Sequence, residues 1–108
     1  MLHIYPVALD LLRALRPSVE GIERRDADLA RQLRRASASV VLNIAEGDGC
    51  SKGSRTARYA TALGSMRETL ACLDVAEALG YVPAVDAVIT AKSKHVIGVL
   101  VKLTQRRA

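Results

Sequence analysis

The chain has 108 residues, of which 50% are hydrophobic and 25% are charged. This length suits a single domain over residues 1–108, and the composition excludes a disordered tail. The chain holds three tyrosines and neither phenylalanine nor tryptophan. A core must therefore be built from aliphatic side chains, which favours packed helices over a β-sandwich.

The surplus of positive charge lies at one end of the sequence. The net charge is +5, yet residues 1–86 hold 11 basic and 11 acidic residues. The cations after Asp86 are Lys92, Lys94, Lys102, Arg106 and Arg107. Such a segment can attract nucleic-acid phosphates or an acidic protein surface. It can equally be a solvated helix whose cations stabilise the negative end of its dipole, and charge alone leaves both interpretations open.

Several classes of protein are disfavoured by what the sequence lacks. Its apolar runs are far shorter than the roughly 20 residues that cross a bilayer. Residues 1–6 lack the basic start and apolar stretch of a secretory signal. The two cysteines, Cys50 and Cys72, have no metal-ligand spacing. We therefore expect a cytoplasmic protein with reduced thiols and no membrane contact.

Hydrophobic spacing predicts a first helix with a break. Apolar residues follow one another at helical steps of three and four; they are Ile4, Ala8, Leu11, Leu15, Val19 and Ile22. Pro17 interrupts this pattern, since proline lacks the amide donor and clashes with the preceding turn. We expect a kink between Arg13 and Pro17.

A second helix is predicted to begin at Asp26, whose side chain can cap it, with Asp28 in the first turn. Its apolar face consists of Leu29, Leu33, Ala36, Val40 and Ile44. Gly47 is expected to end this helix. Residues 47–54 read as the one clear loop, and Ser54 is expected to cap the helix that follows.

The third and fourth helices complete the pattern. The third has a heptad-like apolar face of Tyr59, Leu63, Met66, Leu70 and Leu73. Beside it runs a row of small residues, along which another helix could approach: Ala57, Ala60, Gly64 and Ala71. Gly80 is expected to end this helix. A fourth helix over residues 84–105 places Val85, Ile89, Ser93, Val96, Leu100 and Leu103 on one face.

Four helices of about 20 residues with short connections predict an all-α, antiparallel up-down-up-down four-helix bundle. Apolar residues also lie outside the main faces, namely Val41, Leu42, Ile97 and Val101. A lone bundle needs one apolar face per helix, so additional faces favour a partner surface. Scattered surface hydrophobes are the plainer alternative. We expect a homo-oligomer.

The chemistry of a catalytic or metal site is poorly represented. His3 and His95 are the only histidines, and neither belongs to a Glu-x-x-His pair of the kind that holds metal in bundles. Cys50 in the glycine-rich loop could be activated by Lys52, but a base is missing. The loop also lacks the spacing of a phosphate-binding loop. We expect no enzyme, no metal and no cofactor.

Polar residues within the apolar stretches suggest a structural network. Asn43 and Glu46 lie near the end of the second helix, Glu68 lies on the third, and Arg34 and Arg35 lie upstream. Such groups can satisfy one another across a bundle and bond to loop carbonyls. A catalytic acid is the less favoured interpretation of the two glutamates.

Two sequence elements resemble a known family. The first is Gln32-Leu33-Arg34-Arg35-Ala36, with Ser39 and then Asn43-Ile44-Ala45-Glu46-Gly47. The second is Ala62-Leu63-Gly64-Ser65 with Glu68, followed by Leu79-Gly80-Tyr81. Together they resemble the bacterial four-helix-bundle family named for the 23S rRNA intervening-sequence protein, over about residues 8–103.

The resemblance implies a cytosolic bundle that assembles into a homopentameric ring and has no established catalytic activity. A related branch, the accessory protein of diversity-generating retroelements, assists a reverse transcriptase through a basic surface. The positions carried over are Arg34, Arg35, Asn43, Glu46, Gly47, Gly64, Ser65 and Glu68. The resemblance assigns them mainly structural roles, and Pro17 departs from the family pattern in the first helix.

We therefore expect a non-enzymatic oligomeric scaffold that binds RNA, DNA or a nucleic-acid-processing protein. The candidate contacts are Arg31, Arg34, Arg35, Lys92, Lys94, Lys102, Arg106 and Arg107. The alternative is a protein–protein adaptor without a nucleic-acid role, in which these charges only keep the protein dissolved.

Overall fold

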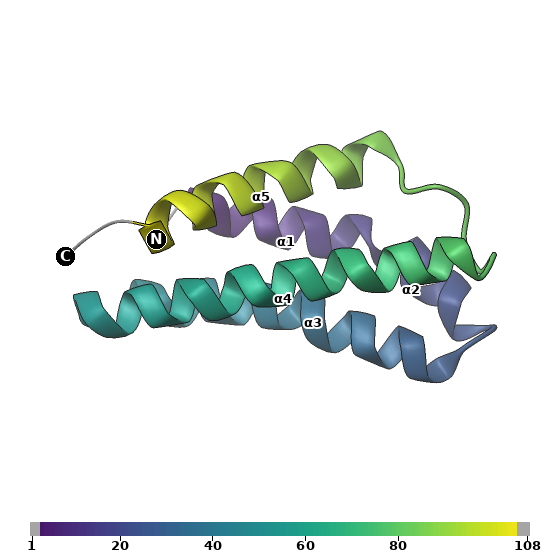
Figure 1. Ribbon diagram of the computed structural model, residues 1–108, viewed down its shortest axis with the longest axis horizontal. Coiled ribbons are helices and arrows are strands. Elements are labelled where there is room, and N and C mark those ends of the chain that lie inside the picture. The colour runs from purple at the N-terminus through teal and green to yellow at the C-terminus, as the bar shows by residue number, and fades with distance from the viewer. Residues whose placement is uncertain (1–2, 106–108) are drawn as a thin grey trace.

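The computed structural model describes residues 3–105, so Arg106 and Arg107 lie outside the described residues. Five helices make up this part of the chain, and it contains no strand (Figure 1). They are α1 (Ile4–Ala14), α2 (Arg16–Glu23), α3 (Ala27–Asp48), α4 (Lys52–Ala78) and α5 (Ala87–Gln105). The first two form one broken rod, so the molecule has four rods, as the hydrophobic spacing predicts.

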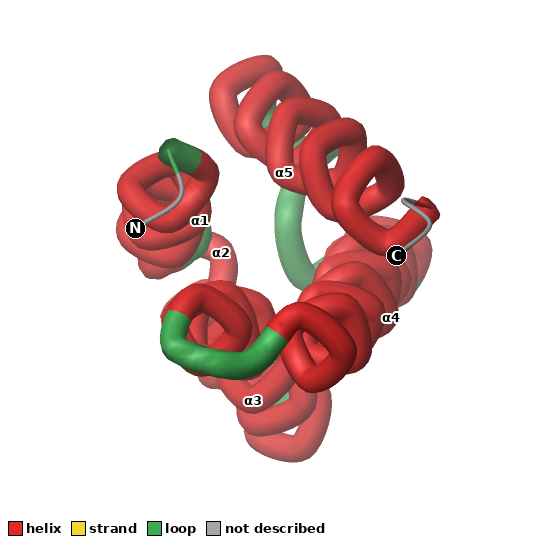
Figure 2. The backbone as a smooth tube through the Cα atoms, turned by 90° about the vertical axis from the view of Figure 1, so that its left-hand side faces the viewer, coloured by secondary structure: helices red, strands yellow, loops and turns green. Residues whose placement is uncertain are grey.

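The rods surround a shared centre, as the view along the long axis shows (Figure 2). The α3 helix packs against α4, α4 against α5, and α5 against α1, while α1 and α2 pack against α3. The α3 and α5 helices consequently lie diagonally across the molecule. The described residues extend over 44 × 24 × 19 Å.

The core is aliphatic and follows the predicted apolar faces closely. Every predicted core residue of the first two segments is buried, and so are most of those on α4 and α5. Leu70, Val85 and Leu103 are half-buried against the same core. Helical periodicity was sufficient to predict the core residues, because each rod contributes one apolar face. The short connections leave few other ways to bury these faces.

The predicted break in the first rod is confirmed. The α1 helix ends at Ala14 and α2 begins at Arg16, with Leu15 between them. Pro17 lies in the first turn of α2, where its missing amide would have had no helical partner. The backbone amide of Val19 still donates to the carbonyl of Leu15 over 2.9 Å, so the rod changes direction without leaving the core.

The predicted end of α3 at Gly47 is wrong. The helix continues to Asp48, and Gly47 is buried within it. A Cβ atom added at Gly47 would lie 2.6 Å from Cε1 of the buried Tyr59. The glycine therefore serves close helix packing instead of chain reversal. The α3–α4 turn is Gly49–Ser51, shorter than predicted, and Ser51 takes the N-cap position that we expected of Ser54.

The opposite end of the bundle is closed by side chains and a glycine turn. Gly80 has a positive φ of 76°, and the amide of Tyr81 donates to the carbonyl of Ala76 over 2.9 Å. This is a Schellman arrangement that ends α4 at the expected glycine. The Arg25 guanidinium lies 5.5 Å from the centre of the Tyr81 ring, which connects the two turns at this end through a cation–π contact.

Side-chain caps set the start of two helices. The Asp26 carboxylate accepts from the amide of Leu29 over 3.0 Å, which confirms the predicted cap of α3. Asp86 does the same for Ile89 over 2.9 Å. Since Asp86 is the cap, α5 begins at Ala87 and not at residue 84 as predicted.

The apolar residues outside the predicted faces divide into two groups. Val41 is buried, and Ile97 and Val101 are half-buried against the core, so the prediction that these three point away from the core is wrong. Leu42 remains 61% exposed. Other exposed large hydrophobes are Val75, Leu79 and Val88. The predicted row of small residues on α4 is also exposed, and no atom lies within 4 Å of a Cβ placed at Gly64.

Gly47→Ala should destabilise the fold by about 1–3 kcal/mol, because the buried Tyr59 ring must move to make room. Gly64→Ala is the matched control. Its methyl group would enter open space on a helix, so it should add about 0.5–1 kcal/mol of stability. Chemical denaturation measures both effects, and equal behaviour of the two variants would contradict the packing role of Gly47.

Ser93→Ala should raise Tm by about 4–8 °C, the effect of roughly 1 kcal/mol in a domain of this size. The Ser93 hydroxyl is buried and has no hydrogen-bond partner among residues 3–105, which costs stability. Ser37→Ala is the control, since the buried Ser37 hydroxyl donates to the carbonyl of Leu33 over 2.8 Å. Thermal unfolding in which both variants lose stability would disprove this account.

Candidate functional site

The cations proposed to contact nucleic acid do not form one surface. Arg31, Arg34 and Arg35 lie on α3, whereas Lys92, Lys94 and Lys102 lie on α5. These two helices are diagonal neighbours in the bundle (Figure 2). The predicted up-down-up-down order already implies this separation, because it makes sequential helices neighbours and sets the second and fourth helices on a diagonal.

Two of the three α3 arginines are already paired with acids. The Arg34 guanidinium makes two hydrogen bonds to the Glu23 carboxylate, at 2.7 and 3.2 Å. Arg31 pairs with Asp28 on the same helix. The Arg34 hydrogen bonds lower the pKa of Glu23, and they raise that of Arg34. This pair joins α2 to α3, so Arg34 does not take part in the polar network predicted for it.

The α5 lysines are available to a ligand. Lys94 and Lys102 are exposed and Lys92 is half-buried. None of the three pairs with a carboxylate within the part of the chain that the structure describes. From Ala87 to Gln105 the helix has no acidic residue at all. The outward side of α5 therefore carries positive charges that no acid of the same helix offsets.

A polar cluster joins α3 to α4 near the middle of the rods. The hydroxyl oxygens of Ser39 and Ser65 lie 2.8 Å apart. The Asn43 amide donates to the Ser39 carbonyl over 2.9 Å and to its hydroxyl over 3.1 Å. Arg58 continues the cluster with an ion pair of 2.7 Å to Glu46. The predicted structural network therefore exists, with Arg58 in the place expected for Arg34 and Arg35.

Sequence reasoning missed the arginines at the start of α4. Arg55 donates to the carbonyls of Gly47 and Cys50, each over 3.2 Å. We expected side chains to donate hydrogen bonds to the loop carbonyls, but we expected the donors to come from α3. The available signal was two arginines within the first two turns after the glycine-rich loop, positions from which long side chains reach back to the preceding helix end.

The outer side of the α3–α4 pair is hollowed into a groove. One hollow of about 370 Å³ is lined by Gln32, Arg35, Ala36, Ser39, Ser65 and Glu68. A second of about 430 Å³ shares Gln32 and Glu68 and continues to Asp26, Asp28, Leu29, Ala71, Cys72 and Val75. We call these two hollows together the α3–α4 groove. Glu68 is exposed in its wall, so its predicted part in a buried network is wrong.

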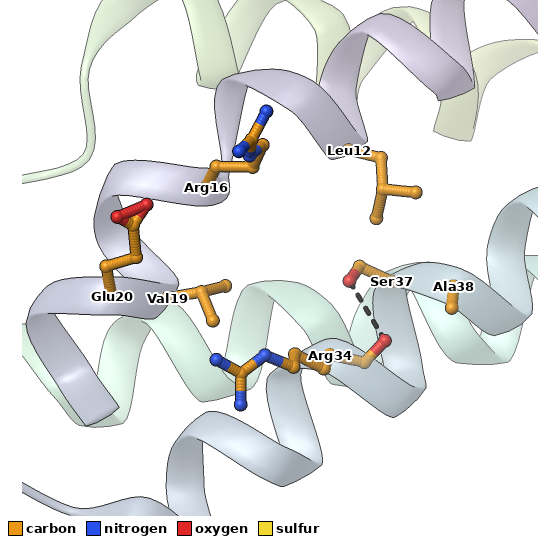
Figure 3. A pocket seen from close by; sticks show the side chains of 7 residues that line it. All are labelled: Leu12, Arg16, Val19, Glu20, Arg34, Ser37 and Ala38. Atoms are coloured by element: carbon orange, nitrogen blue, oxygen red, sulfur yellow. Dashed lines mark hydrogen bonds between the residues drawn. The ribbon is translucent and has the colours of Figure 1, made fainter.

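A third hollow lies where the broken first rod faces α3 (Figure 3). Leu12, Val19 and Ala38 give it apolar walls, and Arg16, Glu20 and Arg34 surround them; the volume is about 410 Å³. The Ser37 hydroxyl beside it donates to backbone carbonyls. The one carboxylate in the lining, Glu20, makes no hydrogen bond to this hydroxyl among residues 3–105, so the hydroxyl is not paired with a base here.

The described residues offer no metal site and no membrane span. No group of three or more histidine, cysteine or acidic side chains among residues 3–105 could hold a metal ion. In the same range, no helix is both long and apolar enough to cross a membrane. Cys72 is buried, and burial raises the pKa of its thiol, which disfavours the reactive thiolate.

The family model for 23S rRNA-intervening sequence proteins matches residues 2–102. The chain belongs to this family. A solved structure is similar over 95% of this chain and 99% of its own, with a TM-score of 0.82 and 16% identity. It is described as a protein of unknown function from the S23 ribosomal protein family of Bacteroides thetaiotaomicron. At this identity it supports the fold alone. No curated protein matches the sequence.

Several residues through which the chain resembles the family lie along the outer side of α3 and α4 and not in the core. Arg35, Ser65 and Glu68 line the α3–α4 groove. Asn43 and Glu46 lie farther along α3 in the polar cluster. Among the eight positions carried over from the resemblance, Gly47 is the one that is buried. The motif therefore marks the seam between these two helices, visible from outside the molecule.

Glu23→Gln should lower Tm at neutral pH by a small amount, on the order of a degree or two, because the pair with Arg34 is exposed. Pairing lowers the pKa of Glu23 in the folded protein. Its contribution is therefore full above the ordinary glutamate pKa of 4.5 and disappears as pH falls through the lowered value. Melting curves from pH 7 to pH 2 should converge for the two proteins, and a difference that persists at pH 2 would contradict the ion-pair explanation.

Proposed function

We propose that the protein is a non-enzymatic helical scaffold that self-associates and binds nucleic acid or a ribonucleoprotein partner. Its fold would be an antiparallel up-down-up-down bundle, working in the bacterial cytoplasm. The family resemblance implies a ring of five copies. The proposal includes no cofactor and no metal.

The observation that carries the nucleic-acid part is the surface of α5. Its lysines extend from a helix without acidic residues and have no carboxylate partner among residues 3–105. When lysines contact phosphates, they release counterions from the nucleic acid, and this release favours binding. Arg31 and Arg34 support the proposal less, since each is already held by an acid.

Self-association is supported by apolar area that one copy leaves exposed. Leu42 on α3 is 61% exposed, Val75 on α4 is 45% exposed, and Leu79, the C-cap of α4, is 54% exposed. Leu79 keeps the helical backbone conformation four residues after Val75, so the two apolar side chains are neighbours. Exposed apolar neighbours of this kind are typical of surfaces that a partner covers.

A protein–protein adaptor without a nucleic-acid role is the second candidate. It is favoured by the α3–α4 groove, whose walls carry the carboxylates Asp26, Asp28 and Glu68. Even with Asp28 paired to Arg31 and with Arg35 in the wall, the acids outnumber the bases, which disfavours phosphates. An acidic groove suits a basic protein segment. Capture of such a protein after nuclease treatment, together with no affinity for RNA or DNA, would support the adaptor.

The deciding experiment is titration with single-stranded RNA and duplex DNA at several salt concentrations, followed by the variant Lys94→Gln/Lys102→Gln. Binding should weaken as salt rises. For duplex DNA, the slope of log K against log salt should fall by about two in the variant, about 0.9 for each lost phosphate contact.

The matched control is Arg13→Gln/Arg31→Gln, which also removes two positive charges. Arg13 and Arg31 pair with aspartates three residues before them, so the slope should change by less than one. Absence of binding at low salt, or equal slopes in the two variants, would refute the assignment to α5. Light scattering of the wild-type protein tests self-association independently, and a monomer at micromolar concentration would refute it.

A further inference from the structure

The α3–α4 groove and the outer side of α5 have complementary shapes and charges. The groove has an apolar floor that includes Leu29 and Cys72, with Val75 at its edge. Its walls carry three carboxylates and one cation, Arg35. Asp26 caps α3 and Asp28 pairs with Arg31, whereas Glu68 has no ion-pair partner among residues 3–105 and is the carboxylate most free to meet an incoming cation. No helix of the same copy covers it. The groove thus has an apolar floor and more acidic than basic residues in its walls, and it is open along the outside of the bundle.

The outer side of α5 has the opposite character. At about 100° per residue, Ala91, Gly98 and Lys102 follow one another along the centre of its exposed side, with Lys94 on one flank and His95 on the other. A Cβ atom placed at Gly98 meets nothing within 4 Å, so a neighbouring helix could approach closely there. We call this row from Ala91 to Lys102 the ridge.

The two features also match in length. The groove runs along α3 from Asp28 to Ser39, twelve residues with a rise of about 16 Å. The ridge from Ala91 to Lys102 spans twelve residues as well. Small residues in both, Ala71 in the groove and Ala91 and Gly98 on the ridge, allow the helix axes to approach closely.

We propose that α5 of one copy occupies the α3–α4 groove of a second copy, with Lys94 and Lys102 facing the groove carboxylates. This inference rests on the self-association in the proposed function and names the two surfaces that form the contact. The surfaces lie on diagonally opposite helices of one molecule, α5 and α3 (Figure 2). A contact between different surfaces is heterologous, and repeating it produces a closed ring or an open chain of copies.

The arrangement has a consequence for nucleic acid. The lysines that are free in one copy become covered when copies assemble. Binding of RNA to α5 and docking of α5 into the groove are then alternatives, and RNA in excess should break the assembly into smaller particles. When nucleic acid is absent, the lysines of α5 would instead contact the groove carboxylates of another copy.

The test exchanges charges between the two surfaces. Asp28→Lys/Glu68→Lys makes the groove basic, and Lys94→Glu/Lys102→Glu makes the ridge acidic. Each double variant alone should weaken self-association at least tenfold in analytical ultracentrifugation, because like charges then meet. The chain with all four substitutions should associate as the wild type does, since the attraction is restored in the reverse sense. An equimolar mixture of the two double variants should also associate.

The control Asp10→Lys/Glu20→Lys carries the same change of net charge as the groove variant but places it on α1 and α2. It should associate within about threefold of the wild type. Circular dichroism shows whether each variant is folded. A double variant that fails to fold leaves the decision to the four-substitution chain and the mixture, both of which must associate if the proposal is correct.

The outcomes separate this inference from the proposed function. A wild-type protein that associates with the same affinity as both double variants overturns the docking of α5 and leaves self-association standing. A wild-type monomer overturns both, and leaves the groove to a basic segment of another protein. A 20-nucleotide single-stranded RNA that saturates the assembly without reducing its mass shows that α5 is not covered, which also overturns the docking.

Discussion

Close packing of α3 against α4 is the contact on which the other helices depend. These are the two longest helices, and they form the most extensive helix pair of the molecule. At one end Gly47 lets the Tyr59 ring lie directly against the α3 backbone. In the middle, the Ser39 and Ser65 hydroxyls meet within the seam. The broken first rod and α5 then complete the core from the other side.

The close approach at Gly47 also fixes the register of the pair. A buried tyrosine ring fits against α3 only where the side chain is absent, so sliding one helix past the other by a turn would bring the ring against Cβ atoms. The hydrogen bonds of Arg55 act in the same sense, because this residue of α4 reaches a carbonyl of α3, at Gly47, and one within the turn, at Cys50. This precise register aligns the residues that line the α3–α4 groove.

Much of the fold was predictable because each rod needs only one apolar face. The spacing of Ile4 through Ile22 predicted the buried side of a rod that proline breaks, and the break changes neither the face nor its partners. Caps were predicted where an aspartate directly preceded the periodic residues, as at Asp26. Gly47 was misread because a glycine that ends a helix and a glycine that admits a neighbouring ring look alike in sequence. Only the position of Tyr59 distinguishes them.

The candidate site was less predictable, because it depends on how side chains from different rods meet. Arg34 was expected beside Asn43 and pairs with Glu23 of the first rod instead. Val41 was expected to face outward, but the α3 helix is contacted on two sides, by α1 with α2 and by α4, so a wider face is buried. The groove itself could not be inferred, since it requires the acids of α3 and Glu68 of α4 to line one hollow.

The two connections at opposite ends of the bundle differ in how they could accommodate added sequence. The Gly49–Ser51 turn is three residues long, and Arg55 of α4 holds it through hydrogen bonds to the carbonyls of Gly47 and Cys50. The connection after α4 has eight residues, from Leu79 to Asp86, and only part of it is anchored to the core. A fluorescent protein or affinity tag inserted near Pro83 and Ala84, both of which are exposed, would leave the helix pair intact. The same insertion at the short turn would disrupt the packing of α3 against α4, the two longest helices.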